Sequence, residues 1–543
     1  GKPYAEPAYR GVTDALDGYG AAWVAMRTAA CEATQVRGDQ SQELMDLRME
    51  CLGRKLRGFA AQVELFVHAD AALVGKAVQA AQSLGDLGEC ANAAALKAPI
   101  APPTDPTVRA MVEELRGKLA EVKVLQSAGR YQQGVASATP LLVLARGLGF
   151  PPLEAEALAL LGDLQVDAGE VKVAEETLTE AVAKADASRH DRARFEAATR
   201  LLHLVGVVQL RFGEAEQWGN QGAAAIARLG GDALLEARLN NHLGGLLYAR
   251  GRYVEARDRY EAALTSMAEV LPANHFLIAR SHNNVGLALS MQGPDRLAEA
   301  LTRLEQSLAL KESALGPDHP DVANSLHNIA EALWKERRND LAEVRARRAL
   351  AIRARTLGPE HLLTASTEML LGIVLAGDHR CDEALALGRR SLATFEASVG
   401  HGHEFVALAH SLLGRCLGDA GRLDQARAHY REAVAILEPL GAELRVLLAE
   451  PLAGLGRLEL ASGATARAAG LLTRALASAE TAPPSDAAGT ADIRFALARA
   501  LWAAPRDRPR AREMATAARQ RFAAAGGGWK AELAEVDAWL AAR

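Results

Sequence analysis

The stretch Asn-His-Leu-Gly-Gly-Leu-Leu-Tyr, residues 241–248, places a glycine in the middle of a short apolar segment. Similar segments recur, and their small central residues lie 42, 44, 42, 42 and 42 positions apart. These central residues are Gly244, Gly286, Ala330, Gly372, Gly414 and Gly456. A fixed period of this length indicates a solenoid, in which each supersecondary unit stacks on the next.

Other small residues follow the central residues at constant distances. Small residues follow the first, third, fourth, fifth and sixth central residues. Those twelve positions later are Ala256, Ala342, Ala384, Ala426 and Ala468, and those nineteen positions later are Ala263, Ala349, Ser391, Ala433 and Ala475. Because small side chains let helices approach closely, each unit is predicted to be a hairpin of helix A and helix B. Glycines seven residues after the central position, Gly251, Gly293, Gly421 and Gly463, are expected to end helix A, since glycine readily adopts the left-handed conformation.

Length and composition favour an all-α solenoid and argue against nucleic-acid binding and against a membrane span. The 543 residues are too many for one ordinary core, whereas a solenoid needs only contacts between neighbouring repeats. Aromatic residues make up only 4% and strand-like alternation is nearly absent, so we expect an all-α fold. The net charge of −5 argues against nucleic acid, and no run of 18 apolar residues predicts a membrane span in this chain. Because the chain begins Gly-Lys-Pro without Met, we expect a fragment or a processed protein.

Breaks in the pattern divide the chain into five predicted segments. These are a cysteine-bearing helical domain (1–96, with helices over 14–33, 41–67 and 70–84), a proline-rich linker (97–108), degenerate repeats (109–230), regular repeats of about 42 residues (231–480), and a degenerate repeat with a C-terminal capping helix (481–543).

Histidines recur where one unit ends and the next begins. Leu-Gly-Pro-Asp-His-Pro (315–320) returns with His361 and His403, and His275 lies one unit earlier. A polar residue at a helix start can cap free amide groups, so we predict this role for the histidines. His401, His403 and His410 have spacing that metal ions use, but capping explains His403 sufficiently, and we expect no metal site.

The periodic residues resemble the tetratricopeptide repeat (TPR). Over residues 230–480, the 42-residue unit and its Leu-Gly-Pro-Asp-His-Pro-Asp-Val-Ala phrase (315–323) resemble the kinesin light chain subclass. The N-terminal region resembles a segment of bacterial Ser/Thr protein kinases that carry C-terminal TPR arrays. The residues that carry this second resemblance are Trp23, Ala-Cys-Glu-Ala-Thr (30–34), Gln40-Ser41, Leu-Arg-Met-Glu-Cys-Leu (47–52), Ala69-Asp70 and Cys90.

The kinase resemblance implies a non-catalytic, extracytoplasmic (periplasmic) region of a membrane-anchored receptor kinase. The chain carries no kinase glycine loop, HRD or DFG motif, and no Walker A, GxSxG or HExxH motif, so we expect no catalytic residue and no cofactor. The alternative is a cytoplasmic TPR scaffold or sensor region of a signalling NTPase. An enzyme is the third and least supported class.

The TPR resemblance implies a concave groove lined by helix A, with a protein or peptide as ligand. Asparagine offers a donor and an acceptor to the backbone of an extended peptide, and arginine attracts acidic groups. The alternatives to groove binding are that these residues are solvated or bond between adjacent helices, and we favour groove binding. The candidates are Arg238, Asn241, Arg280, Asn283, Asn284, His327, Asn328, Glu331 and Arg415.

Five cysteines occur without a CxxC motif: Cys31, Cys51, Cys90, Cys381 and Cys416. They are either free buried thiols or include an N-terminal disulfide, and the extracytoplasmic placement implied by the kinase resemblance favours oxidation. We pair Cys31 with Cys51 as the first expectation, although a simple helical hairpin would separate them by about 9 Å along the helix. Cys90 remains a competitor for either partner.

Overall fold

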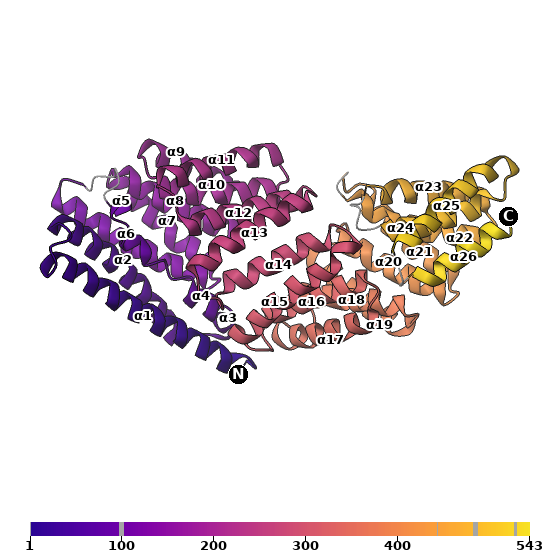
Figure 1. The fold of residues 1–543 in the computed structure, drawn as a ribbon, viewed down its shortest axis with the longest axis horizontal. Coiled ribbons are helices and arrows are strands. Elements are labelled where there is room, and N and C mark those ends of the chain that lie inside the picture. The colour runs from indigo at the N-terminus through magenta and orange to yellow at the C-terminus, as the bar shows by residue number, and fades with distance from the viewer. Residues whose placement is uncertain (1, 97–102, 442–443, 482–486, 526–528) are drawn as a thin grey trace. The chain divides into compact units, whose positions relative to one another are not determined.

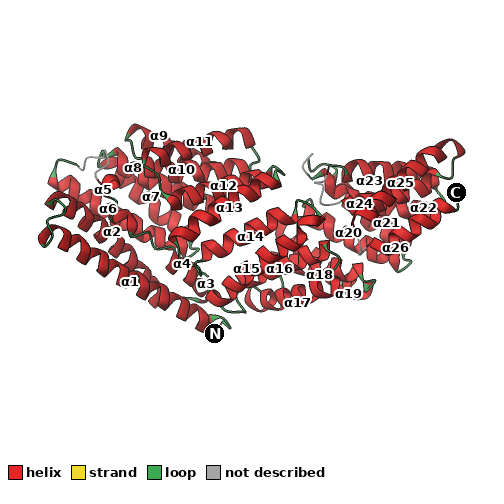
Figure 2. Cartoon of the chain, in the orientation of Figure 1, coloured by secondary structure: helices red, strands yellow, loops and turns green. Residues whose placement is uncertain are grey.

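The computed structural model describes residues 2–96, 103–441, 444–481, 487–525 and 529–543. Every regular element in these ranges is a helix and none is a strand (Figures 1 and 2), which confirms the predicted all-α class. The chain forms two compact units, with residues 1–285 and 309–319 in unit 1, and 286–308 and 320–543 in unit 2. The division passes through α14 (Phe276–Ser290) and α15 (Leu297–Leu315).

The N-terminal helices differ in part from the prediction. Helix α1 (Ala5–Gln35) is longer than the predicted 14–33, whereas α2 (Gln42–Val67) begins as expected, with Ser41 Oγ accepting from the Leu44 amide at 3.2 Å. The helix predicted over 70–84 is wrong. It is divided into α3 (Ala71–Val74) and α4 (Ala77–Gln82), because the φ of Lys76 is −121° and leaves the helical range.

The next helices of unit 1 form consecutive hairpins. Their bounds are α6 (Pro106–Ser127), α7 (Tyr131–Gly147), α8 (Pro151–Asp167), α9 (Val171–Ala187), α10 (Asp191–His203), α11 (Phe212–Arg228), α12 (Ala233–Ala249) and α13 (Tyr253–Val270). Before them lie the short elements η1 (Gly88–Cys90) and α5 (Ala93–Leu96). Helix α6 begins inside the predicted linker because Asp105 caps it and proline is tolerated in a first helical turn.

Unit 2 continues the hairpins toward the C-terminus. Its bounds are α16 (Pro320–Lys335), α17 (Asn339–Thr356), α18 (Leu362–Gly377), α19 (Cys381–Val399), α20 (Glu404–Asp419), α21 (Leu423–Leu437), α22 (Ala449–Ala461), α23 (Thr465–Ala479), α24 (Ala487–Leu501), α25 (Arg508–Ala525) and α26 (Lys530–Ala541). None of the described helices is long and apolar enough to cross a membrane.

The central small residues let a side chain of helix B rest on helix A. A Cβ added at Gly244 would lie 2.6 Å from the Tyr260 ring, and one at Gly456 would lie 2.6 Å from Leu472. The predicted helix ends are also confirmed, since Gly251 and Gly421 have φ of 76° and 72°. The period therefore reflects a packing arrangement that recurs at Gly244, Gly286, Gly414 and Gly456.

The N-terminal segment returns to a distant part of unit 1. His275 Nε2 donates to the Gln82 carbonyl oxygen and His319 Nε2 donates to the Gly75 carbonyl oxygen, each at 3.1 Å. Beside these bonds, Leu315 is buried with Val78 and other apolar side chains. Figure 1 shows α3 and α4 beside the start of α14 and the end of α15.

Candidate functional site

Polar side chains join each helix A of unit 1 to the next, and we call this set the polar row. It comprises Arg116 and Gln126 on α6, Glu156, Asp163 and Asp167 on α8, Arg192, Glu196 and Arg200 on α10, Arg238, Asn241 and His242 on α12, and Arg280 and Asn284 on α14. Arg116 bonds to Glu156, and Gln126 bonds to both Asp163 and Asp167. The row thus runs through five successive A helices, of which only α12 and α14 lie in the regular 42-residue repeats.

In the middle of the polar row, on α8, α10 and α12, the charged side chains are already paired with one another. Arg200 Nε lies 2.6 Å from an Asp163 oxygen, and Arg238 donates to Glu196 at 2.8 Å. Burial raises the pKa of the Glu196 carboxyl, but Arg238 outweighs burial and the net pKa is lowered well below its usual value. Arg238 is therefore neutralised by a neighbouring helix, which limits its value for attracting an acidic ligand.

The end of the polar row on α12 and α14 is more open. Asn284 Nδ2 donates to Asn241 Oδ1 at 3.0 Å. This hydrogen bond joins the A helices of neighbouring repeats, as the alternative to groove binding predicts. Within the described residues, the Asn241 amide nitrogen and the Asn284 amide oxygen have no protein partner. One donor and one acceptor therefore remain available side by side.

Arg280 is the unpaired cation of this row. It is exposed, and among the residues that the structure describes it makes no hydrogen bond or ion pair, only a contact over its own helix's Phe276 ring at 6.0 Å. Desolvation by the surrounding protein, followed by the charge of Arg238, lowers its pKa. An exposed guanidinium that is nevertheless crowded by protein offers its donors to an anion without first breaking an internal pair.

The remaining unit 1 candidates are half-buried beside these groups. Asn283 precedes Asn284, and His242 follows Asn241. Burial first, and the charge of Arg238 next, lower the pKa of His242 well below its ordinary value, so this imidazole is neutral near pH 7. Sequence reasoning named Asn241 and Arg280 from their register. It did not name Arg192 and Glu196, for which the repeat pattern offers no signal.

One unit 2 candidate, His327, lies beside a buried arginine, Arg353, that could not be recognised from the sequence. Arg353 is only 3% exposed and donates to Asn324 Oδ1 at 2.7 Å and to the Leu363 carbonyl at 2.8 Å. His327 Nδ1 lies 3.5 Å from an Arg353 nitrogen, and burial together with this charge lowers the pKa of His327 to about 4. His327 is thus a neutral inter-repeat residue at pH 7.

Three further unit 2 candidates have different surroundings. Glu331 pairs with Lys335 at 2.9 Å, which satisfies its charge within α16. Asn328 is half-buried on the same helix. Arg415 on α20 makes no hydrogen bond or ion pair with any residue described, and it is half-buried. Arg415 follows the central Gly414 directly, so its position in the repeat differs from that of Arg280, which lies six residues before Gly286.

The recurring histidines cap helices as predicted. His361 Nδ1 accepts from the Leu363 amide at 3.1 Å, and His403 Nδ1 accepts from the Phe405 amide at 3.2 Å. His401 instead pairs with Glu396 and Glu432. The described residues contain no group of three or more His, Cys, Asp or Glu that could hold a metal ion.

The expected Cys31–Cys51 disulfide is wrong. Cys51 on α2 is bonded to Cys90 on η1, with Cα atoms 5.6 Å apart, and Cys31 is a free, exposed thiol. Cys31 lies near the end of α1, whereas Cys51 lies nine residues inside α2, so the two positions are offset along the helical hairpin. The element η1 crosses α2 at the level of Cys51 and supplies the partner.

Comparison with known proteins identifies the repeats. The tetratricopeptide repeat family matches residues 235–294, 295–354, 323–397 and 405–481. Nephrocystin-3 of Xenopus laevis is 32% identical over 97 residues, which is 17% of this chain and only 6% of the length of that protein.

Solved structures resemble the fold at low sequence identity. The apo form of the quorum sensor NprR from B. thuringiensis has a TM-score of 0.50 at 17% identity, covering 67% of this chain and 99% of NprR. Apo RapI has a TM-score of 0.47 at 14% identity, covering 75% and 98%. A Podosopora anserina chain described as a kinesin light chain with TPR-like repeats has a TM-score of 0.33 at 22% identity, covering 38% and 97%. These likenesses concern the fold alone.

Proposed function

We propose that this all-α array of TPR repeats is a non-catalytic binding region that holds an extended protein segment along the polar row of unit 1. The observation that carries the proposal is Arg280, which is exposed and has no partner among the described residues. Arg238, one repeat earlier, is already paired with Glu196. A carboxylate of the bound segment would pair with Arg280, because a guanidinium and a carboxylate form charge-assisted hydrogen bonds.

Asn241 and Asn284 would hold the backbone of the same segment. Their mutual hydrogen bond fixes both side chains and leaves one amide nitrogen and one amide oxygen unused. A peptide unit offers the matching carbonyl and N–H groups without requiring a particular side chain. Asn283, and in unit 2 His327, Asn328, Glu331 and Arg415, remain candidates for further contacts of this kind. The array would then select a ligand by one charge and by an extended backbone.

Selection from a displayed library of random twelve-residue peptides tests this proposal. Selected peptides would be titrated by fluorescence anisotropy against the wild-type chain, Arg280→Gln, Asn241→Ala and Asn284→Ala. Loss of a neutral hydrogen bond is expected to weaken binding by about 1 kcal/mol, and loss of the charged one by about 2 kcal/mol. Asn328→Ala, expected to cost about 1 kcal/mol, tests the unit 2 candidate.

The matched control is Asn240→Ala, because Asn240 is the neighbouring asparagine on α12 and accepts a hydrogen bond from Arg259 on helix B. It is expected to bind the selected peptides as the wild type does. Equal affinity of the wild type and of the Asn241→Ala/Asn284→Ala double variant would contradict the backbone contact. Equal affinity of Arg280→Gln would contradict the charged contact.

For cellular context, we propose an extracytoplasmic region of a receptor-type Ser/Thr protein kinase, as the N-terminal resemblance implies. The Cys51–Cys90 disulfide supports this placement, because disulfides persist mainly in oxidising compartments. The alternative is a cytoplasmic TPR scaffold or sensor region of a signalling NTPase. Detection of the protein in periplasmic or in cytoplasmic cell fractions separates these contexts, and absence of ATP turnover by the purified chain tests the non-catalytic role.

A further inference from the structure

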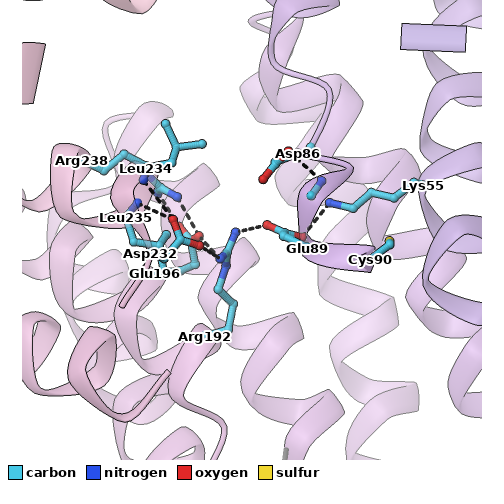
Figure 3. Close-up of polar contacts among 12 residues, drawn as sticks. Lys55, Asp86, Glu89, Cys90, Arg192, Glu196, Asp232, Leu234, Leu235 and Arg238 are labelled. Atoms are coloured by element: carbon cyan, nitrogen blue, oxygen red, sulfur yellow. Dashed lines mark hydrogen bonds and ion pairs between the residues drawn. The ribbon is translucent and has the colours of Figure 1, made fainter. Parts of the chain in front are cut away.

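Glu89 of the N-terminal segment reaches the polar row. Its carboxylate lies between Lys55 on α2 and Arg192 on α10 (Figure 3), and one of its oxygens is 2.7 Å from Lys55 Nζ while the other accepts from Arg192. Glu89 and Arg192 are 103 positions apart in the chain. The contact therefore joins two parts of unit 1 that the repeat pattern does not connect.

Three carboxylates lie within ion-pair distance of Arg192, and Glu89 is the one contributed by the N-terminal segment. Glu196, 3.7 Å from Arg192, is shared with Arg238, to which it is bonded at 2.8 Å. Asp232, 3.5 Å from Arg192, accepts the Leu234 and Leu235 amides at the start of α12. Of the three carboxylates, Glu89 is the one that accepts a hydrogen bond from Arg192, although it is also bonded to Lys55.

Glu89 remains an anion in this position. Burial raises the pKa of its carboxyl, but the charges of Lys55 and Arg192 outweigh burial, and the net pKa is lowered. The side chains of Arg192 and Glu89 are each about one-third exposed to solvent. Another molecule could therefore bring a carboxylate to Arg192 if Glu89 moved away.

The disulfide anchors the residue next to Glu89. Cys90 follows Glu89 directly and is bonded to Cys51 on α2. Non-covalent contacts also hold η1, since Arg48 donates to the Cys90 carbonyl at 3.2 Å and Asp86 accepts the Gly88 amide at 2.8 Å. The disulfide is the covalent link that keeps the residue next to Glu89 on α2, and reduction removes it.

We propose that Glu89 is an internal ligand that occupies the place of an acidic side chain of the bound segment, and that reduction of Cys51–Cys90 releases it. This inference rests on the proposed function of the polar row. A dithiol reductant transfers two electrons and two protons to the disulfide, giving two cysteine thiols and the oxidised, cyclic form of the reductant. The segment carrying Glu89 is then free to leave Arg192, which becomes available to an acidic ligand.

Fluorescein-labelled octaglutamate is the probe for the first test, titrated by anisotropy against the full chain at low salt. Glu89→Gln is expected to bind the probe at least about fivefold more tightly than the oxidised wild type, because the competing internal carboxylate is gone. Glu255→Gln removes a carboxylate from an Arg252–Glu255 pair on the exposed side of α13, so it is the matched control and should bind as the wild type does. Glu89→Gln/Arg192→Gln should lose the gain.

The redox arm uses the same probe. Dithiothreitol is expected to tighten binding to the wild-type chain by a factor similar to that of Glu89→Gln. The Cys51→Ser/Cys90→Ser variant should bind tightly with or without dithiothreitol. If neither Glu89→Gln nor dithiothreitol changes the affinity for the probe, the proposal that Glu89 is an internal ligand is refuted. If Arg280→Gln nevertheless weakens binding, the proposal that the polar row binds an acidic ligand stands. Insensitivity to Arg280→Gln as well would refute both.

A second measurement does not depend on probe binding. Phenylglyoxal modifies accessible arginines, and mass spectrometry of the digested chain reports the modification of Arg192. Modification of Arg192 should be faster in Glu89→Gln and in the reduced wild type than in the oxidised wild type, while modification of Arg280 stays constant. An unchanged Arg192 rate in both would overturn the proposal even if octaglutamate binds to none of the variants.

Discussion

At the scale of single residues, two non-glycine residues of unit 2 adopt a left-handed backbone conformation at a position where other repeats have glycine. Arg337 and His379 have φ of 58° and 59°, at the repeat position where Gly421 has φ of 72°. A residue with a Cβ atom is disfavoured there by roughly 1 kcal/mol. Arg337 has compensation, because its guanidinium lies 4.0 Å from the Trp529 ring and 2.9 Å from Glu532. His379 has no polar partner among the described residues.

His379→Gly is therefore expected to stabilise unit 2 by roughly 0.5–1 kcal/mol, since the strain is relieved and no contact is lost. The midpoint of urea unfolding followed by circular dichroism measures the change. Arg337→Gly is the matched control, because it relieves the same strain but removes the Trp529 and Glu532 contacts. A greater stabilisation by Arg337→Gly than by His379→Gly would contradict this account.

Residue roles set by the nearby chain could be predicted from the sequence, whereas roles set by distant partners could not. The glycine at 421 and the caps at His361 and His403 depend only on their own helix ends. The partner of Cys51 lies 39 positions away on a short element, and its identity depends on how η1 crosses α2. The same holds for Glu89 and Arg192, whose pairing no local pattern encodes.

At the scale of helices, one aromatic ring shows how tightly neighbouring hairpins of unit 2 pack. Tyr430 on α21 lies against Gly414 on α20 and Gly454 on α22, and it is buried. A Cβ added at Gly414 would lie 2.9 Å from the ring, and one at Gly454 only 2.2 Å from it. The absence of a side chain at both positions therefore sets the separation of the helices.

Gly454→Ala is expected to destabilise unit 2 by about 1–3 kcal/mol, because the ring of Tyr430 must move within a packed core. Gly470→Ala on α23 is the control, since nothing lies within 4 Å of its added Cβ. That substitution should instead stabilise by about 0.5–1 kcal/mol, as alanine favours a helix interior over glycine. Urea unfolding of the two variants compares these effects, and equal shifts of the same sign would refute the packing explanation.

The period predicted the helical hairpins but not the places where a helix changes type. Helix α10 continues into a five-residue π-helix, Leu204–Val208, in the repeat whose pattern is degenerate. A Cβ on Gly206 within it would lie 2.5 Å from Leu246 and 2.7 Å from Ala215. The irregular turn thus coincides with the close approach of two neighbouring helices at Gly206, and contacts with distant residues leave no periodic signal in the sequence.

At the scale of the whole molecule, half-buried neutral histidines make both units sensitive to acid. An unfolded histidine titrates near pH 6.5, whereas the pKa of His327 is lowered to about 4 and that of His242 is lowered well below 6.5. Between these values the unfolded chain binds more protons than the folded chain. The stability is therefore complete above about pH 6.5 and falls as the pH drops toward 4.

Urea midpoints at pH 7.5, 6.0 and 5.0 are expected to fall steadily for the wild-type chain. In His327→Gln, unit 2 should lose less stability over this pH range than in the wild type, because the glutamine side chain does not titrate. His361→Gln is the control, since His361 is exposed at the start of α18. If His327→Gln keeps the full pH dependence of the wild type, His327 contributes nothing to the acid sensitivity.

The Cys51–Cys90 disulfide is expected to stabilise unit 1, because it closes a loop of 39 residues and restricts the unfolded chain. The loop-entropy relation gives about 4 kcal/mol, so Cys51→Ser/Cys90→Ser should lower the stability of unit 1 by about 2–4 kcal/mol. Cys31→Ser removes a free, exposed thiol and should have almost no effect. Equal unfolding midpoints of both variants, or two free thiols at Cys51 and Cys90 in non-reducing peptide maps, would contradict the pairing.

The bonds from His275 to Gln82 and from His319 to Gly75 restrict how this array can gain or lose repeats during evolution. The two histidines lie 44 positions apart, one repeat period, and both acceptors belong to the same short N-terminal stretch. An insertion or deletion of one hairpin between residues 131 and 270 would displace both histidines from their acceptors at once. A duplication after residue 320 would leave both bonds intact. Relatives of this protein that differ in repeat number are therefore expected to differ after residue 320, with the count before it constant.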